Sequence, residues 1–270
     1  MKYKIIFLFA VLLICFTIVH AQVDKWDVYL AQYEKGAGST TINISAKEKA
    51  PVHSLPYVVI TGVTFSDCTS EGFPTGEQFS ALYNISDSVQ AIMNRTVKNE
   101  IVGTFTYQCQ RLEYYYVNDT LTIRDKLQKM YSRQFKTYQP YITIKTDSSW
   151  EAYLQFLYPN EETYEYMLNQ KVIMKLQEQG DELIKERKVD HWIYFKTVAD
   201  RNCFEEYAKQ NNFKIEAKDK GKSGSMPYSL QVSRIDKIDI DSISQLTLKL
   251  RKQAEKCNGD YDGWETVVVK

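Results

Sequence analysis

The chain has 270 residues, of which 34 are basic, 34 are acidic and 44% are hydrophobic. This charge balance gives no overall basic character of the kind that usually accompanies nucleic-acid binding, so we expect no nucleic-acid partner. The length is sufficient for two domains, and the 20 tyrosines and 4 tryptophans favour a high β content.

The first segment has the pattern of a secretory signal peptide. Lys2 and Lys4 precede an apolar run from Ile5 to Val19, and Ala21 provides a small residue at the cleavage position. The run has 15 residues, fewer than the ~20 that a membrane-spanning helix needs, so we expect no stable membrane insertion after cleavage. Cleavage after Ala21 predicts an extracytoplasmic (periplasmic or secreted) chain that begins at Gln22. Loss of the two lysines leaves 32 basic and 34 acidic residues, a net charge of minus two.

The N-terminal half begins with a hairpin pattern and then follows the order βαββαβ. Residues Trp26 to Ser45 alternate around Gly36-Ala37-Gly38, which indicates a hairpin turn. Thr75 and Gln78 have the spacing of a capping box at a helix start. The further predicted elements are a strand at Leu55 to Phe65, a helix whose apolar face carries Phe79, Leu82, Ile85, Val89 and Ile92, strands at Glu100 to Tyr107 and Arg111 to Val117, a helix at Leu121 to Phe135 and a strand at Tyr141 to Lys145.

A helical connector runs from Glu161 to Gly180, where the glycine is suited to a left-handed helix stop, and the C-terminal half then repeats the βαββαβ order. Asp200 is the predicted cap of a helix that continues to Lys209. The remaining predicted elements are strands at Asp190 to Phe195, Phe213 to Ala217 and Tyr228 to Val232, a helix with Ile243, Leu246, Leu250, Ala254 and Cys257 on one face, and a last strand at Tyr261 to Val269.

The βαββαβ order typically builds a four-stranded antiparallel sheet with both helices on one face. We therefore predict an α+β protein with two tandem ferredoxin-like domains, joined by a helical connector. The predicted division is a signal peptide at 1–21, a first domain at 22–160, and a second domain at 161–270 that includes the connector.

Two short motifs in the C-terminal half resemble the first and last strands of the RraB-like family. They are Val189-Asp190-His191-Trp192-Ile193-Tyr194-Phe195 and Tyr261-Asp262-Gly263-Trp264-Glu265-Thr266. The family is named for a protein inhibitor of a cytoplasmic ribonuclease. The resemblance thus implies a regulatory role, whereas the predicted signal peptide implies a different compartment.

The region from Trp26 to Pro159 resembles the family of domains of unknown function numbered 695. The residues that carry this resemblance are Leu55-Pro56-Tyr57, Val102-Gly103, Arg111, Tyr116 and Asp147-Ser148-Ser149-Trp150-Glu151-Ala152-Tyr153. The two families are known to occur in this order. Neither resemblance brings a catalytic motif.

The residue types argue against a metal or nucleotide site, so we expect no cofactor. Only His53 and His191 remain after signal removal, and no C-x-x-C or H-E-x-x-H spacing occurs. The segment Gly221 to Ser225 contains residues that suit phosphate binding. It lacks the P-loop spacing and lies between two predicted strands, so we interpret it as a hairpin loop.

Asp190 and His191 are adjacent, and they form the one neighbouring acid–imidazole pair of the chain. Because neighbours in a strand point to opposite faces, Asp190 is poorly placed to orient the ring of His191. His191 shares its predicted face with Ile193 and Phe195. A core histidine is therefore the favoured interpretation, and catalysis is the minor one.

Asp262-Gly263 predicts a bulge or tight bend inside the last strand. Trp264 is then expected to pack in the core, as most tryptophans do. The functional alternative places Trp192, Tyr194, Tyr261, Asp262 and Trp264 in one candidate binding surface, since the first and last strands of such a sheet are neighbours. Stacking of nucleic-acid bases on it is disfavoured, because Ser229, Gln231 and Ser233 occupy the adjacent strand where aromatic residues are required.

Four cysteines remain after signal cleavage, two in each half. The helix topology places Cys203 and Cys257 at the same end of their domain, so an oxidising compartment permits a disulfide between them. Cys68 and Cys109 form the second possible pair. Four free, buried thiols are the alternative.

The sequence thus predicts an exported, non-catalytic interaction or regulatory protein with an unidentified protein partner. An enzyme with a site in the cleft between the domains, built from Asp190, His191 and Asp262, is the alternative. A ribonuclease-inhibitor role is the third possibility, and it requires that the signal peptide fails.

Overall fold

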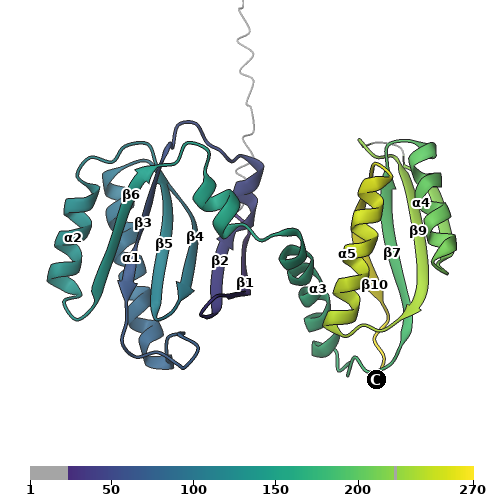
Figure 1. Ribbon diagram of the computed structural model, residues 1–270, viewed down its shortest axis with the longest axis horizontal. Helices are drawn as coiled ribbons and strands as arrows, with labels where there is room; N and C mark the ends of the chain where they lie inside the picture. Colours follow the sequence, from purple (N-terminus) through teal and green to yellow (C-terminus); the bar gives the residue numbers. More distant parts are fainter. Residues whose placement is uncertain (1–23, 222–223) are drawn as a thin grey trace, which may run out of the picture.

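The computed structural model describes residues 24–221 and 224–270, and shows two antiparallel β-sheets with their helices (Figure 1). The predicted α+β class is therefore confirmed. The predicted signal peptide lies outside the described residues, as does part of the loop from Gly221 to Ser225. Within the described ranges, no helix is long and apolar enough to cross a membrane.

The N-terminal half forms a sheet of six strands in the order β1-β2-β4-β5-β3-β6, with antiparallel neighbours throughout. Its elements are β1 (Trp26–Tyr33), β2 (Gly36–Asn43), η1 (Ile44–Glu48), β3 (Tyr57–Thr64), α1 (Gly76–Thr96), β4 (Asn99–Tyr107), β5 (Gln110–Val117), α2 (Ile123–Gln134), β6 (Gln139–Thr146) and η2 (Ala152–Leu157). The alternation of residues in β5 explains why this sheet has a core on each face. Tyr115 and Val117 pack with α1 and α2, whereas Tyr114 and Tyr116 pack on the opposite face with η2.

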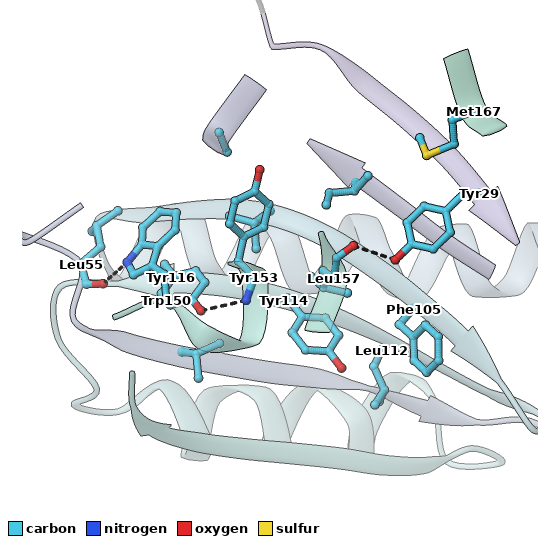
Figure 2. Close-up of a cluster of buried hydrophobic side chains, with 14 residues drawn as sticks. Tyr29, Leu55, Phe105, Leu112, Tyr114, Tyr116, Trp150, Tyr153, Leu157 and Met167 are labelled. Carbon is cyan, nitrogen blue, oxygen red and sulfur yellow. Dashed lines mark hydrogen bonds between the residues drawn. The ribbon is translucent and has the colours of Figure 1, made fainter. Parts of the chain in front are cut away.

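Four residues of the resemblance in the region from Trp26 to Pro159 meet in the core at η2, although they are far apart in the sequence: Leu55, Tyr116, Trp150 and Tyr153 (Figure 2). Trp150 stacks on Tyr116 with ring centroids 4.0 Å apart, and its Nε1 donates to the Leu55 carbonyl at 3.0 Å. Trp150 has a left-handed φ of 58°, which costs ~1–3 kcal/mol for such a residue. Its full burial and its hydrogen bond offset that cost.

Asp147 connects this network to the start of η2. Its carboxylate accepts a hydrogen bond from the Tyr116 hydroxyl at 2.6 Å, and others from the backbone N–H groups of Glu151 and Ala152 at 2.8 and 2.9 Å. Burial alone would raise the pKa of Asp147, but these hydrogen bonds hold it below its usual value. The matched residues therefore have a structural role, because they fix one segment over the sheet.

The first hairpin turns at a different place from the prediction. Tyr33 pairs with Gly36, so Glu34 and Lys35 form the turn, whereas Gly36 and Gly38 are part of β2. A Cβ at Gly38 would lie 2.7 Å from the ring of Tyr33. This glycine is therefore explained by close ring packing and not by a turn.

Two predicted helix caps are also wrong in detail. The Thr75 hydroxyl donates to Asp67 at 2.7 Å and does not cap α1, so the predicted capping box with Gln78 is not formed. In the C-terminal half, Thr197 is the cap of its helix and accepts a hydrogen bond from the backbone N–H of Asp200 at 3.1 Å. Asp200 lies in the first helical turn, where its negative charge interacts favourably with the helix dipole.

The C-terminal half follows α3 (Glu161–Glu178) and forms a sheet in the order β10-β7-β9-β8. Its elements are β7 (Arg187–Phe195), α4 (Val198–Gln210), β8 (Lys214–Lys220), β9 (Tyr228–Asp236), α5 (Ile240–Lys256) and β10 (Gly259–Thr266). The helices α4 and α5 pack on the same face, since Phe204 and Leu250 share a core cluster with Ile193 of β7. Gly180 has a φ of 87°, so the predicted left-handed helix stop is confirmed.

A buried ion pair lies just after α3. Arg187 donates from Nη2 to Oδ1 of Asp181 at 3.0 Å, and the backbone N–H of Val269 donates to Oδ2 of the same carboxylate at 2.8 Å. The hydrogen bond from Arg187 lowers the pKa of Asp181 to about 2. The pair thus joins the segment that enters β7 to the segment that leaves β10.

Candidate binding surface

One face of the C-terminal sheet is packed against helices, and the opposite face is open. In β7, Val189, Ile193 and Phe195 are fully buried on the helix side. Trp192 and Tyr194 alternate with them and are partly exposed on the other side. Antiparallel sheets commonly leave one face to water, but the expected side chains there are polar. Two large aromatic residues that are partly exposed on the same face make this face a candidate binding surface.

A β-bulge in β10 shapes the surface beside these aromatic residues. Tyr261 pairs with Ile193, and Gly263 pairs with Trp192, so Asp262 is the extra residue. The bulge predicted from Asp262-Gly263 is confirmed. A shallow hollow of about 330 Å³ lies here, lined by Trp192, Tyr194, Asp262, Gly263, Trp264 and Glu265.

The bulge divides the five residues of the predicted surface between the two faces. Trp192, Tyr194 and Asp262 lie on the open side, whereas the side chains of Tyr261 and Trp264 pack in the core and are only 2% and 8% exposed. The alternative that places all five residues in one surface is therefore wrong, and the favoured interpretation of Trp264 as a core residue is confirmed. The physical reason is the extra residue, which returns Trp264 to the same side as Tyr261.

Trp264 packs between β10 and the connector helix. Its indole Nε1 donates to Oδ1 of Asn169 on α3 at 2.7 Å, and Asn169 in turn donates to the Thr247 hydroxyl of α5 at 2.8 Å. The buried indole thus has the partner that its N–H requires. This network explains why α3 belongs to the packing of the C-terminal half.

His191 is a core residue and has no exposed surface. Its Nδ1 shares a hydrogen bond with the Tyr261 hydroxyl at 2.8 Å. Burial, with a smaller effect of the nearby Arg234 charge, lowers the pKa of His191 to about 3. The ring is therefore neutral at pH 7 and cannot supply a proton there.

Asp190 lies on the opposite side of β7, as its adjacent position predicts. Its Oδ1 accepts hydrogen bonds from Lys188 at 2.8 Å and from Gln231 at 3.1 Å. Asp262 is exposed at the bulge. The candidate polar cluster of Asp190 and His191 is thus split by the strand, and the three residues of the hypothetical active site do not converge.

The groove between the two halves lies elsewhere. It has a volume of about 910 Å³ and is lined by residues of β1 and α3, including Val28, Leu30, Tyr166 and Met174. Asp27 and Lys171 form an ion pair across it. None of the residues assigned to the hypothetical active site lines this groove.

A charged network borders the aromatic residues on the open face. Glu216 of β8 accepts a hydrogen bond from the Ser233 hydroxyl at 2.7 Å and forms ion pairs with Lys214 at 2.9 Å and with Lys188 at 3.2 Å. The hydrogen bond from Ser233 and the two lysines lower the pKa of Glu216 to about 2. The sequence did not single out Glu216, because a bulge between Ile215 and Ala217 sets its direction.

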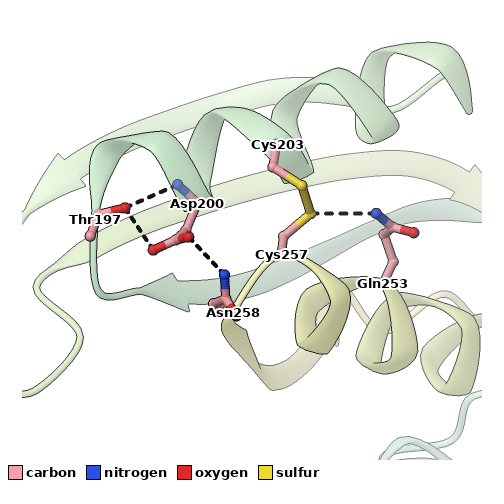
Figure 3. Close-up of a disulfide and its surroundings, with 6 residues drawn as sticks. All are labelled: Thr197, Asp200, Cys203, Gln253, Cys257 and Asn258. Carbon is pink, nitrogen blue, oxygen red and sulfur yellow. Dashed lines mark hydrogen bonds between the residues drawn. A yellow bond between two sulfur atoms is a disulfide. The ribbon is translucent and has the colours of Figure 1, made fainter.

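Each half contains one disulfide bond. Cys203 of α4 joins Cys257 at the end of α5, with Cα atoms 5.8 Å apart (Figure 3). Cys68 joins Cys109, also with 5.8 Å between the Cα atoms. These are the two pairs that the sequence predicts.

The sequence comparisons assign both halves to families. Residues 24–158 match the model of the family of unknown function DUF695, which is 135 of the 270 residues, and residues 167–266 match the model named regulator of ribonuclease activity B. The chain therefore belongs to the DUF695 family and carries after that region a second α+β region that matches the model named regulator of ribonuclease activity B. No curated protein matches the chain.

Proposed function

We propose that this chain is an exported, non-catalytic regulatory protein that holds a protein partner on the open face of its C-terminal sheet. The observation that carries the proposal is the partial exposure of Trp192 and Tyr194 beside the hollow at the bulge. Aromatic residues with a polar surround are the typical anchors of a protein interface. The name of the second matched family, a regulator of ribonuclease activity, also favours a regulatory role.

The acidic residues beside Trp192 and Tyr194 favour a partner with basic groups. Asp262 and Glu265 are exposed at the hollow and form no ion pair among the described residues. Charges at the rim of an interface mainly increase the association rate and select the partner. The expected partner thus presents cationic side chains around an apolar pocket that receives Trp192.

The proposal includes the ferredoxin-like arrangement of both halves. The strand order β10-β7-β9-β8 supports it in the C-terminal half, and the order β6-β3-β5-β4 supports it in the first, with the β1–β2 hairpin added at the edge. In this arrangement both helices cover one face and leave the other available for binding. A comparison of main-chain coordinates with an experimental structure of this chain tests it.

Affinity capture from the cell envelope tests the binding face. Captured proteins are identified for the tagged mature chain, for Trp192→Ala and for Phe79→Ala, a control that removes an exposed aromatic residue of α1. We expect a specific partner with the parent chain and the control, and a loss of more than about tenfold with Trp192→Ala, as at an interface hot spot. Equal recovery by all three proteins contradicts the proposed face.

Cell fractionation tests the proposed location. We expect the chain outside the cytoplasm with an N-terminus at Gln22. Recovery of the uncleaved chain in the cytoplasm contradicts export, and it favours instead the third possibility, inhibition of a cytoplasmic ribonuclease. An assay of ribonuclease activity with the purified chain then decides that possibility.

A further inference from the structure

A groove on the N-terminal half is lined by positive charges from two helices. On α2, Lys126, Lys129 and Arg133 are spaced by three and four residues, so they lie on one face of the helix. All three are exposed. Arg95 is added from the last turn of α1. These four residues line a hollow of about 350 Å³ between the two helices.

The hollow has an apolar floor and one internal polar contact. Ile92 of α1 and Met130 of α2 form the floor, and Met130 is almost completely buried in the core between the helices and the sheet. Lys126 donates from Nζ to the Thr96 hydroxyl at 3.2 Å. This hydrogen bond thus links the two helices at the hollow.

The positive charges of this groove are not neutralised by the protein. The hollow has no acidic residue in its lining, and Arg95, Lys129 and Arg133 form no ion pair within residues 24–221 and 224–270. Like charges at this helical spacing destabilise a helix. Repulsion between these charges therefore destabilises the free protein, and an anion bound in the hollow would remove this repulsion.

Another hollow of the described residues differs, because its cations Arg234, Lys237 and Lys249 share their lining with Glu186 and Asp236. Lys188, Lys209, Lys214 and Lys218 all pair with carboxylates. The whole sequence has equal numbers of basic and acidic residues. Unpaired lysines such as Lys175 and Lys252 also occur elsewhere among the described residues, so the distinctive feature of the α1–α2 groove is that four cations surround one hollow without an acidic residue in its lining.

We propose that the α1–α2 groove binds a phosphate-bearing ligand with at least two negative charges. Arginine binds phosphate oxygens with two parallel hydrogen bonds, and lysine adds a point charge. The volume is within the range of small-molecule sites, about 300–1,000 Å³. An acidic protein would need a much larger contact area, about 800 Å² on each partner. The apolar floor contacts the uncharged part of the ligand. A soluble phosphorylated molecule and a phospholipid headgroup both have this chemistry.

Binding of pyrophosphate and of lipid vesicles by the full mature chain tests the proposal and separates the two sources. Titration calorimetry measures pyrophosphate, and flotation measures vesicles with and without cardiolipin, whose headgroup carries two phosphates. The groove variant is Lys129→Gln with Arg133→Gln. The control variant is Lys175→Gln with Lys252→Gln, which removes the same charge from exposed positions on α3 and α5.

We expect the parent chain and the control variant to bind equally, and the groove variant to bind at least about tenfold more weakly. Its melting temperature without ligand should equal or exceed that of the parent chain, because like-charge repulsion has been removed. Binding of pyrophosphate supports a soluble ligand, and binding of the anionic vesicles alone supports a lipid headgroup. Absence of both, or equal weakening in the two variants, overturns the proposal. So does a preference for polyglutamate over both phosphate probes, since it indicates an acidic protein partner.

Discussion

At the scale of single residues, burial determines the protonation of His191. Its pKa is lowered from 6.5 to about 3 in the folded chain. Below pH 6.5 the unfolded chain therefore binds a proton that the folded chain does not, and the free energy of unfolding decreases as the pH falls. We expect His191→Asn to remove a slope of up to ~1.4 kcal/mol per pH unit between pH 6.5 and 4.5. Urea unfolding over this interval measures it.

Acidic groups with shifted pKa values also change the stability of the chain with pH, and they are present in both the parent chain and His191→Asn. Asp181 and Glu216, each with a pKa of about 2, affect stability only below this interval. The pKa of Glu113 is raised by burial, and its effect has the opposite sign, because its stabilisation is lost as the pH rises. The contributions of Asp181, Glu216 and Glu113 cancel when the free energy of unfolding of the variant is subtracted from that of the parent chain. His53→Asn, which changes the exposed histidine, should retain the slope. An unchanged slope in His191→Asn would show that His191 is not buried in solution.

Trp264 and Trp192 test the two faces of the C-terminal sheet separately. Trp264→Ala should lower the free energy of unfolding by ~3–5 kcal/mol, because it leaves a cavity and removes the partner of Asn169. Trp192→Ala should change it by about 1 kcal/mol or less, as expected for a partly exposed side chain. Chemical denaturation of both variants measures the difference. Similar losses in both would place Trp192 in the core.

At the scale of elements, the two disulfides stabilise neighbouring helices and loops. They close loops with sequence separations of 54 and 41 residues, and each contributes ~4 kcal/mol in the chain-entropy model. We expect the purified mature chain, alkylated after unfolding without reductant, to gain no label by mass spectrometry. Cys203→Ser should lower stability by that amount and release one reactive thiol. Four labels on the parent chain would contradict both bonds.

The order of elements could be predicted from the sequence because hydrophobic periodicity and turn residues act locally. The strand from Tyr57 to Thr64 and the stop at Gly180 are examples. Features that depend on tertiary contacts could not be predicted in this way. Gly38 resembled a turn residue, but it accommodates the ring of Tyr33 from the neighbouring strand β1. Thr75 resembled a cap, but a distant carboxylate takes its hydroxyl.

The candidate site could also be predicted where local patterns determine it, but not where it depends on tertiary contacts. Alternation along β7 correctly separated Asp190 from His191, and Trp192 from the core. In β10 the bulge and the core position of Trp264 were predicted, but the side of Tyr261 was not, because the effect of the extra residue depends on the partner strand. No sequence motif indicates the α1–α2 groove. Its charges come from two helices that are brought together only in the fold.

At the scale of the whole molecule, α3 decides where the chain can be divided. Its contacts are mainly with the C-terminal half, through Asn169 and the cluster that contains Ile173, Leu176 and Trp264. The proposed boundary near residue 160 therefore predicts that a fragment of residues 161–270 unfolds cooperatively. A fragment of residues 181–270 lacks these contacts and should be markedly less stable. Thermal unfolding followed by circular dichroism compares them, and equal stability would place α3 outside the domain.

The fold of the C-terminal half does not require the extra residue in β10, whereas the hollow beside Trp192 does. Removing Gly263 restores regular alternation, with Tyr261 and Trp264 still on the core side. A deletion at this position is therefore expected to fold, but to lose the hollow beside Trp192. Among related sequences, an insertion or deletion at this point would then mark a change of partner, even where every core residue is retained.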